Sequence, residues 1–594
     1  MISIKRKLSS IKGILGVLSL KKERIQSLGS ELEKRSAKSP DKTLILFEDR
    51  TLTYDQFNKL ANRYSHMFLK MGYKRGNTVV LLMDNRPEFL AIHAGLSKIG
   101  VIPALINNNI TGEVLVHAIN IAEVSGVILG AEYASKYKKI ETGITLKSPG
   151  LIFIEKEGET ISTPESMEDL QPLLDVSSDE NPDVYPPITS KDTLEYIYTS
   201  GTTGMPKATV LTQKKWLQTG YGTGGFMLNG IPDDIQYCCL PLYHNSGINL
   251  AWGGTIMTGG TIALRRKFSA SEFWNDVRKF NASSFVYIGE LCRYLNNQPP
   301  KENDADNPLR IITGNGMRGD YWLDFKKRFN IEKIVEAYGA TEGIGALINK
   351  KGVPGMIGKL NVLWMKMGAV VAYDQDNEKL IRNKDGFIKK CREGEKGMFL
   401  AEINKLNPFP GYKNNQKATN SKIINDVFRK GDSYFISGDL FKLHKNNYVS
   451  FVDRLGDTFK WKGEVVATNE VADILNRFGG IEDSNVYGVE VKNTEGRCGM
   501  VSFTLLPEMG IDMKKLAAYV MEKLPVYARP YFVRMRSKKD ATTTFKQVKT
   551  VIQKEGFDPS VISDTLYFLN PKTKEYISLN NDEYSKIQNG EYQF

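Results

Sequence analysis

Hydrophobic positions along the chain switch repeatedly between two spacings, and this pattern predicts a mixed α/β architecture. Residues 52–73 have helical periodicity, and the short β-branched runs 78–82 and 101–106 follow with a second helical stretch between them. Strands that alternate with helices are typical of βαβ units. We therefore expect a largely parallel sheet in this part of the chain.

The first 28 residues have a pattern of their own. Apolar residues recur at helical spacing among many cations; the apolar positions are Ile4, Leu8, Ile11, Leu15 and Leu18, and the cations are Lys5, Arg6, Lys7, Lys12, Lys21, Lys22 and Arg24. This predicts a basic amphipathic helix, which either lies on a membrane surface or packs against its own domain. A secretory signal is less well supported because Lys12 interrupts the apolar stretch. No apolar run reaches the 18 residues of a spanning helix.

Changes in composition divide the rest of the chain. Residues 156–192 are rich in Glu, Asp, Ser and Pro, which predicts a solvated surface loop. A strand over "TLEYIYT" follows, then a glycine-rich loop, and then an expected helix. Near Asp453 the pattern changes to a charged turn, a short hairpin and a helix from about Asn469. We expect an N-terminal segment 1–28, a large domain 29–452 and a smaller domain 453–594.

Composition and charge narrow the class of protein only in part. A chain of 594 residues with 41% hydrophobic and 25% charged residues is typical of a soluble globular protein with more than one unit. The formal charge of +12 favours acidic partners such as nucleotides or anionic lipids. The cations are dispersed and no recognition motif appears, so we do not expect nucleic-acid binding. The five cysteines have no metal-binding spacing, which indicates a reducing, cytosol-facing compartment.

The glycine-rich loop "YTSGTTGMPK", residues 198–207, carries the strongest chemical signal. Backbone N–H groups unshielded by side chains, several hydroxyls and one lysine together suit a di- or triphosphate. The loop matches neither the common P-loop, because Pro206 precedes Lys207, nor GxGxxG. By composition alone a surface turn would be as good an explanation.

The longer stretch "YTSGTTGMPKATVLTQ" resembles the phosphate-binding loop of the adenylate-forming superfamily, which includes acyl-CoA synthetases. Further motifs of that superfamily follow in the expected order: "ITGNG", "AYGATEG", "SGDLF" and "DRLGD". Segments such as "YIGELCRYL" and "EGFDP" are similar to the fatty-acid transport protein and very-long-chain acyl-CoA synthetase family. The resemblance extends from about Leu52 to Pro559.

The resemblance implies a fold and an activity. The fold is a large N-terminal α/β adenylate-forming domain with a smaller, mobile C-terminal α+β domain that rotates between two half-reactions. The activity is an ATP- and Mg²⁺-dependent ligation of a long or very long fatty acid to CoA through acyl-AMP, with release of pyrophosphate. A peripheral position on the cytoplasmic face of a membrane is also implied.

The resemblance also implies roles for single residues. ATP or AMP would be bound by Thr199, Ser200, Gly201, Thr202, Thr203, Gly204, Lys207, Gly314, Asn315, Gly316, Tyr338, Gly339, Ala340, Asp439 and Arg454. The expected catalytic residues are Lys546, Thr341, Glu342, His244 and Lys460. Glu342 and Thr199 would hold Mg²⁺, and Gly463 and Glu464 would serve the thioester step. Each of these residue types, taken singly, is more often an ordinary surface or core residue.

Two departures and three rival functions stay open. Thr543 stands where the family has glycine before the catalytic lysine, and Val465 stands where asparagine is usual. The rival enzymes are a ligase for bile acids or sterol side chains and one that passes the acyl group to a carrier-protein thiol. The third rival is a membrane-bound fatty-acid uptake protein with weak ligase activity.

Overall fold

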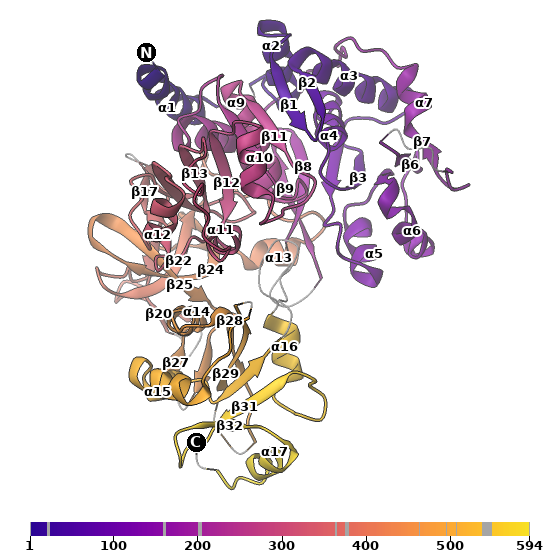
Figure 1. The fold of residues 1–594 in the computed structure, drawn as a ribbon. Coiled ribbons are helices and arrows are strands. Elements are labelled where there is room, and N and C mark those ends of the chain that lie inside the picture. The colour runs from indigo at the N-terminus through magenta and orange to yellow at the C-terminus, as the bar shows by residue number, and fades with distance from the viewer. Residues whose placement is uncertain are drawn as a thin grey trace.

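The computed structural model describes residues 2–20, 24–157, 162–199, 205–362, 365–374, 379–461, 464–492, 494, 496–506, 508–536, 549–592 and 594. A large N-terminal body carries two extensive sheets with helices packed on them, and a smaller C-terminal body forms the lower part of the molecule in Figure 1. The expected α/β fold with a large N-terminal and a small C-terminal domain is confirmed.

The first sheet of the large body has a parallel centre. Its order is β7-β6-β5-β3-β4-β8-β9, with bounds β3 Thr78–Leu82, β4 Ile102–Leu105, β5 Gly126–Gly130, β6 Leu151–Glu155, β7 Glu168–Asp169, β8 Thr193–Thr199 and β9 Lys207–Thr212. The strand predicted over 78–82 is confirmed, and the one predicted over 101–106 is observed as β4. Both pair in parallel, and every residue of β3 is buried, as expected where helices cover both faces.

The second sheet is larger and mixed. Its main path is β19-β22-β24-β25-β16-β15-β14-β13-β12-β10-β11-β1-β2, and β23 pairs with β24. The bounds are β1 Thr43–Phe47, β2 Arg50–Thr53, β10 Ile235–Cys238, β11 Thr261–Leu264, β12 Ser284–Ile288, β13 Ile311–Asn315, β14 Lys333–Tyr338, β15 Leu347–Asn349, β16 Gly358–Lys359, β19 Gly368–Val371, β22 Lys396–Glu402, β23 Ile423–Asn425, β24 Ser433–Leu443 and β25 Tyr448–Arg454. Strands β10 to β14 run parallel, so their carboxyl ends meet at one edge.

Local sequence explains where the helices begin and end. Helix α3 starts at a capping box in which Thr53 and Gln56 exchange hydrogen bonds, and its buried face follows the helical spacing Phe57, Ala61, Tyr64 and Phe68. Helix α4, Pro87–Ile99, is followed by Gly100, whose φ of +70° suits glycine.

The described helices of the large body, including α3 at Tyr54–Lys70, have the following bounds. They are α1 Ile2–Ser19, α2 Leu28–Lys38, α5 Gly112–Ile121, η1 Ala131–Tyr133, α6 Ala134–Lys138, η2 Glu141–Gly143, α7 Leu170–Asp175, α8 Gln213–Gly220, η3 Tyr221–Met227, η4 Ser246–Trp252, α9 Gly253–Thr258, α10 Phe273–Lys279, α11 Gly289–Asn296, α12 Trp322–Arg328, α13 Gln416–Ser421 and η5 Lys445–Asn447.

The C-terminal body has a core separate from that of the large body. Its sheet has the order β28-β29-β30-β31-β32, with bounds Ile481–Val489, Cys498–Leu505, Phe532–Met535, Thr565–Leu569 and Tyr576–Ser578. Helices α14 Thr468–Leu475, η6 Val526–Ala528, α15 Met513–Lys523, α16 Lys549–Glu555 and α17 Asn581–Gln588 accompany it. The predicted hairpin is present as β26 Phe459–Trp461 and β27 Glu464–Val466.

The large body also has two short two-stranded ribbons. One pairs β17 Asn361–Val362 with β18 Met365–Lys366, and the other pairs β20 Tyr373–Asp374 with β21 Lys379–Leu380.

Two local predictions are wrong. The segment after the phosphate loop is not a helix but strand β9, which pairs antiparallel with β8, and helix α8 begins only at Gln213. Alternating β-branched residues in "KATVLT" favour this strand. The expected loop 156–192 contains β7 and helix α7, because Leu170 and Leu174 are buried among the polar residues around them.

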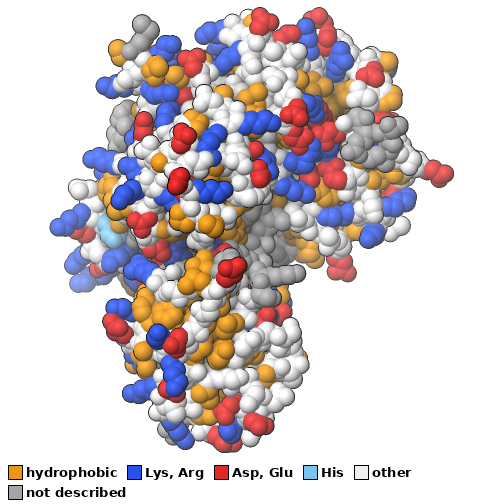
Figure 2. Space-filling model, viewed as in Figure 1, with side chains coloured by type: hydrophobic (Ala, Val, Ile, Leu, Met, Phe, Trp, Pro, Cys, Tyr) orange, Lys and Arg blue, Asp and Glu red, His pale blue; other side chains and the backbone are white. Residues whose placement is uncertain are grey.

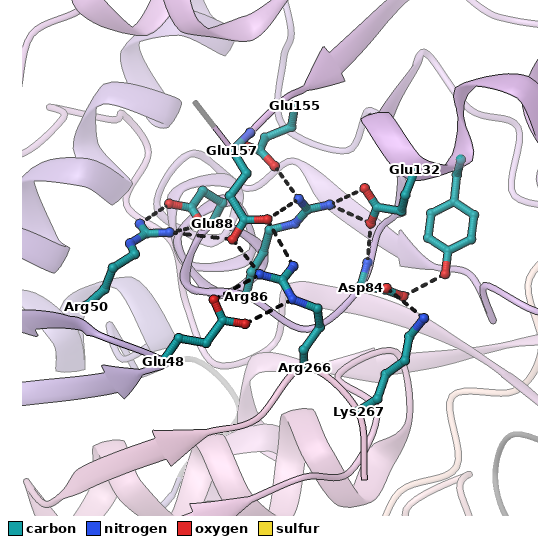
Figure 3. A network of polar contacts seen from close by, with 11 residues as sticks. Glu48, Arg50, Asp84, Arg86, Glu88, Glu132, Glu155, Glu157, Arg266 and Lys267 are labelled. Carbon is teal, nitrogen blue, oxygen red and sulfur yellow. Dashed lines mark hydrogen bonds and ion pairs between the residues drawn. The ribbon is translucent and has the colours of Figure 1, made fainter. Parts of the chain in front are cut away.

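A network of ion pairs joins the two sheets of the large body (Figure 3). Arg86, which follows β3, lies 2.5 Å from Glu132 and 3.2 Å from Glu155, and it also contacts Glu157. Glu157 in turn binds Arg266, which follows β11 of the other sheet. Burial raises the pKa of Glu155 to about 7, although the guanidinium of Arg86 opposes this rise. Arg86 is thus the main counter-charge of a buried carboxyl group.

We expect Arg86→Ala to lower the free energy of unfolding by about 3–5 kcal/mol, because it leaves buried carboxylates without their cation. Equilibrium denaturation monitored by tryptophan fluorescence measures this change. Lys279→Ala is the control: the Lys279 side chain is 56% exposed and its partner Asp49 is fully exposed, so the change should stay within about 0.5 kcal/mol. Equal effects of the two substitutions would contradict the importance assigned to Arg86.

Candidate active site

A cavity of about 1580 Å³ lies between the large body and the C-terminal body. The residues that line it include many predicted from sequence: His244, Gly314, Asn315, Gly316, Tyr338, Gly339, Ala340, Thr341, Asp439 and Arg454. They come from five separate stretches of sequence. The fold therefore brings these predicted motifs into one site.

The parallel strands β12, β13 and β14 position two of these motifs. Asn315 and Tyr338 are the last residues of β13 and β14, so both motifs lie at the carboxyl edge of the sheet, where open α/β sheets bind ligands. Glycine is required at the first motif. A Cβ atom on Gly314 would lie 2.0 Å from the carbonyl oxygen of Tyr287, and Gly316 has a φ of +85°.

A buried carboxyl group holds this glycine loop in place. Glu336, on β14, accepts a hydrogen bond from the backbone N–H of Gly316 and another from the hydroxyl of Tyr287. Burial raises the pKa of Glu336 to about 8, and these hydrogen bonds act in the opposite direction. Sequence reasoning missed this residue, because an acidic residue inside a strand carries no motif of its own.

Tyr338 and Asp439 meet in the cavity wall. The Tyr338 hydroxyl donates to Oδ2 of Asp439 at 2.5 Å, and Arg454 Nε donates to Oδ1 of the same carboxylate at 3.2 Å. Burial and the Asp439 carboxylate together raise the pKa of Tyr338 far above its ordinary value. The Tyr338 ring packs edge-on against Phe441, with centroids 4.9 Å apart. These contacts link β14, β24 and β25 at the point where the two bodies join.

Glu342 lies beside the base of the phosphate loop rather than in the cavity lining. Its carboxylate accepts a hydrogen bond from the Tyr412 hydroxyl at 2.6 Å, and Lys207 Nζ lies 5.6 Å from the centroid of the Tyr412 ring. Lys207 also pairs with Thr199 in the β8–β9 ladder. This arrangement connects the predicted metal residue to the predicted phosphate-binding residues.

Lys422 adds a cation to the same region. Burial lowers the pKa of Lys422, and the nearby charge of Lys207 lowers it further. The carboxylates of Glu342 and Asp439 act in the opposite direction. Sequence reasoning missed both Lys422 and Tyr412. The only local signal for Tyr412 is the turn-forming "PFPG" before it, and its contact with a glutamate 70 residues earlier cannot be read from spacing.

No group of three or more His, Cys, Asp or Glu residues with metal-binding geometry occurs in the described part of the chain. In nucleotide sites Mg²⁺ is bound through one or two carboxylates together with substrate phosphates rather than by an all-protein cage. The Glu342 carboxylate, fixed by Tyr412 next to Lys207 and Thr199, is a suitable ligand. The residues present therefore fit the ion.

A buried polar cluster lies behind His244. Glu195 on β8 and His93 on α4 are fully buried, and His93 Nε2 lies 2.8 Å from Glu195 Oε2. The other carboxylate oxygen accepts from Asn249, which also donates to Asn245. Asn245 and Asn249 line the cavity together with His244. The strand that leads into the phosphate loop is thus tied to the segment that carries His244.

One side of the C-terminal body forms part of the cavity wall. Lys549, at the start of α16, lines it and donates to Thr468 Oγ1 at 2.5 Å. Two arginines of the large body bind this side: Arg318 lies 2.5 Å from Asp473, and Arg293 lies 3.2 Å from Asp483. Asp453 is buried and accepts hydrogen bonds from Thr468 and Asn469, which fixes the junction of the two bodies.

Some predicted residues are not brought into the cavity, and others are not described. Lys460 and Glu464 belong to the β26–β27 hairpin and are not among the described residues that line the cavity. Eight of the residues singled out from sequence lie outside the described residues: Ser200, Gly201, Thr202, Thr203, Gly204, Gly463, Thr543 and Lys546. The face of the C-terminal body that meets the cavity here is therefore the one that carries Lys549.

We expect Glu336→Gln to change the pH dependence of stability. Between the ordinary glutamate pKa of 4.5 and the raised value of about 8, the folded chain holds a proton that the unfolded chain has lost. Stability conferred by this group is therefore present at low pH and falls as the pH rises through that window. Denaturation midpoints between pH 5 and pH 9 should decline less steeply in the variant. Glu332→Gln, at an exposed glutamate next to β14, is the control, and identical slopes in wild type and Glu336→Gln would exclude the raised pKa.

Comparison with known proteins identifies the family of the chain. The model of the family described as AMP-binding enzyme matches residues 32–386. The chain is 42% identical to long-chain fatty acid transport protein 6 of Mus musculus, over 93% of this chain and 89% of the relative. It is 36% identical to the medium/long-chain-fatty-acid–CoA ligase FadD6 of Mycobacterium tuberculosis, with coverage of 93% and 89%.

A solved structure shares the fold. The anthranilate CoA ligase AuaEII, in complex with anthranoyl-AMP, superposes with a TM-score of 0.77 at 18% identity and covers 91% of this chain and 98% of its own. The family model covers more than half of the chain, and both relatives align along almost its whole length. The chain therefore belongs to the AMP-binding enzyme family, in the branch of the long-chain fatty acid transport proteins and fatty-acid–CoA ligases.

Proposed function

We propose that this protein is an ATP-dependent ligase that activates a long or very long fatty acid as acyl-AMP and transfers the acyl group to CoA. One observation carries the proposal: a single large cavity joins the polar adenylate motifs to a wall of apolar side chains. Its volume of about 1580 Å³ exceeds the roughly 300–1,000 Å³ of ordinary small-molecule sites. It is therefore suited to a nucleotide and an acyl chain together.

The first half-reaction requires the fatty-acid carboxylate to attack the α-phosphorus of ATP, and pyrophosphate leaves. Tyr338 and the Gly314–Gly316 loop would hold the adenine, while Asp439 and Arg454 would bind the ribose hydroxyls. Thr341 and His244 line the same cavity and would face the α-phosphate and the carboxylate. Thr199 and Lys207 flank the phosphate loop and, together with residues 200–204, would bind the distal phosphates.

Charge on the reacting oxygens must be stabilised in the transition state. Mg²⁺, held by Glu342 and Thr199, would neutralise phosphate charge when bound. Lys546 would supply an ammonium from the C-terminal body, and Lys422 adds a fixed cation near Glu342 and Asp439. Closure of the C-terminal body would exclude water from the mixed anhydride.

The second half-reaction requires another face of the C-terminal body. We place the domain boundary at Asp453, so that the body formed by residues 453–594 rotates and brings Lys460, Gly463 and Glu464 to the site of CoA attack. The ion pairs Arg318–Asp473 and Arg293–Asp483 would break during this rotation. The N-terminal segment 1–28 and the large domain 29–452 would stay fixed.

Membrane contact through helix α1 is part of the proposal. Four apolar side chains on its outer face are 49–63% exposed: Ile4, Leu8, Ile11 and Leu15. Lys5, Lys7 and Lys12 are exposed beside them, and Figure 2 shows hydrophobic and basic side chains adjacent in the region where Figure 1 places α1. This surface suits an anionic bilayer, reached from the cytoplasmic side. No helix in the described ranges is both long and apolar enough to cross a membrane.

Three rival functions of the same site can be distinguished. A ligase for bile acids or sterol side chains would use the same nucleotide motifs, and a panel of carboxylic acids distinguishes it. Free CoA as the sole acceptor distinguishes a CoA ligase from an enzyme that loads a carrier protein. A mere uptake protein would not need the contacts that organise Asp439, Arg454 and Glu342.

We expect the purified protein to exchange labelled pyrophosphate into ATP only when a long-chain fatty acid is present, and to form acyl-CoA when free CoA is added. Lys546→Ala is the control. It should reduce acid-dependent exchange by about 10²- to 10³-fold while sparing the transfer of preformed acyl-AMP to CoA. Absence of exchange with every acid tested would refute the proposed activity.

We expect the protein to sediment with vesicles that contain phosphatidylserine, and the binding to weaken as salt rises. Leu8→Asp should reduce binding by about tenfold or more, since it removes an exposed leucine side chain that would be buried in the lipid interface on binding. Leu323→Asp, at an exposed leucine of α12, is the matched control. If both variants bind vesicles as wild type does, α1 does not form the membrane contact.

A further inference from the structure

Helix α1 has three distinct faces, of which the sequence pattern revealed one. The face opposite the exposed apolar stripe packs on η3 of the large body. Gly13 and Gly16 make this contact so close that a Cβ atom on Gly13 would lie 2.7 Å from the Phe226 backbone nitrogen, and one on Gly16 would lie 2.4 Å from the Tyr221 ring. Packing against its own domain, one of the two expectations from sequence, is therefore observed.

Polar contacts fix the position of the helix along η3. Arg6 forms a bidentate pair with the buried Asp234, at 2.6 and 2.9 Å. Lys350 donates to Ser10 at 2.7 Å, and Ser9 donates to the Gly230 carbonyl at 2.5 Å. Burial alone would raise the pKa of Asp234, but Arg6 and Arg310 stabilise its carboxylate. The net effect lowers the pKa of Asp234 to about 2. These contacts make α1 a fixed part of the large body.

The third face of α1 lines the cavity. Ile14, Val17 and Leu18 contribute apolar side chains to its wall, as do Phe226, Met227 and Ile348. Leu18 continues the sequence stripe of Ile4 to Leu15 but points to the cavity rather than to solvent. Gly222 of η3 also lines this region, and a Cβ atom added there would meet nothing within 4 Å.

We infer that α1 is a wall of the subsite for the acyl tail and that Ile14, Val17 and Leu18 set the length of chain that the enzyme accepts. The inference rests on the proposed ligase activity. The α1 side chains that line the cavity are apolar, unlike the polar adenylate motifs that line the same cavity. A methylene chain gains free energy by leaving water for such an apolar surface. Open space beside Gly222 leaves room for the chain at this wall of the cavity.

The test compares hexadecanoate with octanoate as substrates of the full-length protein in the absence of vesicles. Ile14→Trp extends a side chain from α1 into the cavity, and Gly222→Leu extends one from η3, where the backbone tolerates a side chain. Each should lower the ratio of kcat/KM for hexadecanoate to that for octanoate by about tenfold, which corresponds to lost burial of about two methylene groups. The KM for ATP should not change.

Ile2→Trp is the matched control, because Ile2 lies on the same helix and is 61% exposed, and its ratio should equal that of wild type. An unchanged ratio in both Ile14→Trp and Gly222→Leu, in proteins that still activate octanoate, would overturn the inference. A wild-type protein that activates no acid would instead refute the proposed function. If Ile14→Trp alone fails to fold, the ratio for Gly222→Leu decides.

Discussion

The site depends on how closely the backbones at the ends of β12 and β13 approach each other. A Cβ atom on Gly289 would lie 1.7 Å from the carbonyl oxygen of Gly316, so any side chain there would force the two segments apart. The approach brings the Gly316 N–H within reach of the buried Glu336 carboxyl group. The adenylate motifs at the edge of the sheet can share one cavity because these small residues let the loops meet.

Around this edge the protein gives each of several buried or half-buried carboxylates a specific partner. Glu195 has His93 and Asn249, Asp439 has Tyr338 and Arg454, and Glu342 has Tyr412. A buried polar group without such a partner is costly. The hydrogen bonds therefore fix the orientation of carboxylates before a nucleotide binds, which reduces the reorganisation that binding and reaction would require.

The sequence predicted those features that depend on local pattern or on a long motif. The parallel strands β3 and β4, the β26–β27 hairpin and the start of α14 follow from local periodicity, and the motifs at Gly314–Gly316, Tyr338 and Asp439 converge as the family resemblance implies. Strand β9 escapes this reasoning because the pattern predicts a helix directly after the glycine-rich loop, whereas the short run Lys207–Thr212 pairs with β8 first. Glu336, Tyr412 and Lys422 were missed because their roles arise from contacts between distant segments, which no spacing encodes.

Helix α1 also constrains how the chain reaches its final form. The residues that it contacts, such as Asp234 and Gly230, lie more than 220 positions later in the chain. Until that segment has been made, the glycine face of α1 has no surface on which to pack, and such non-local contacts form slowly.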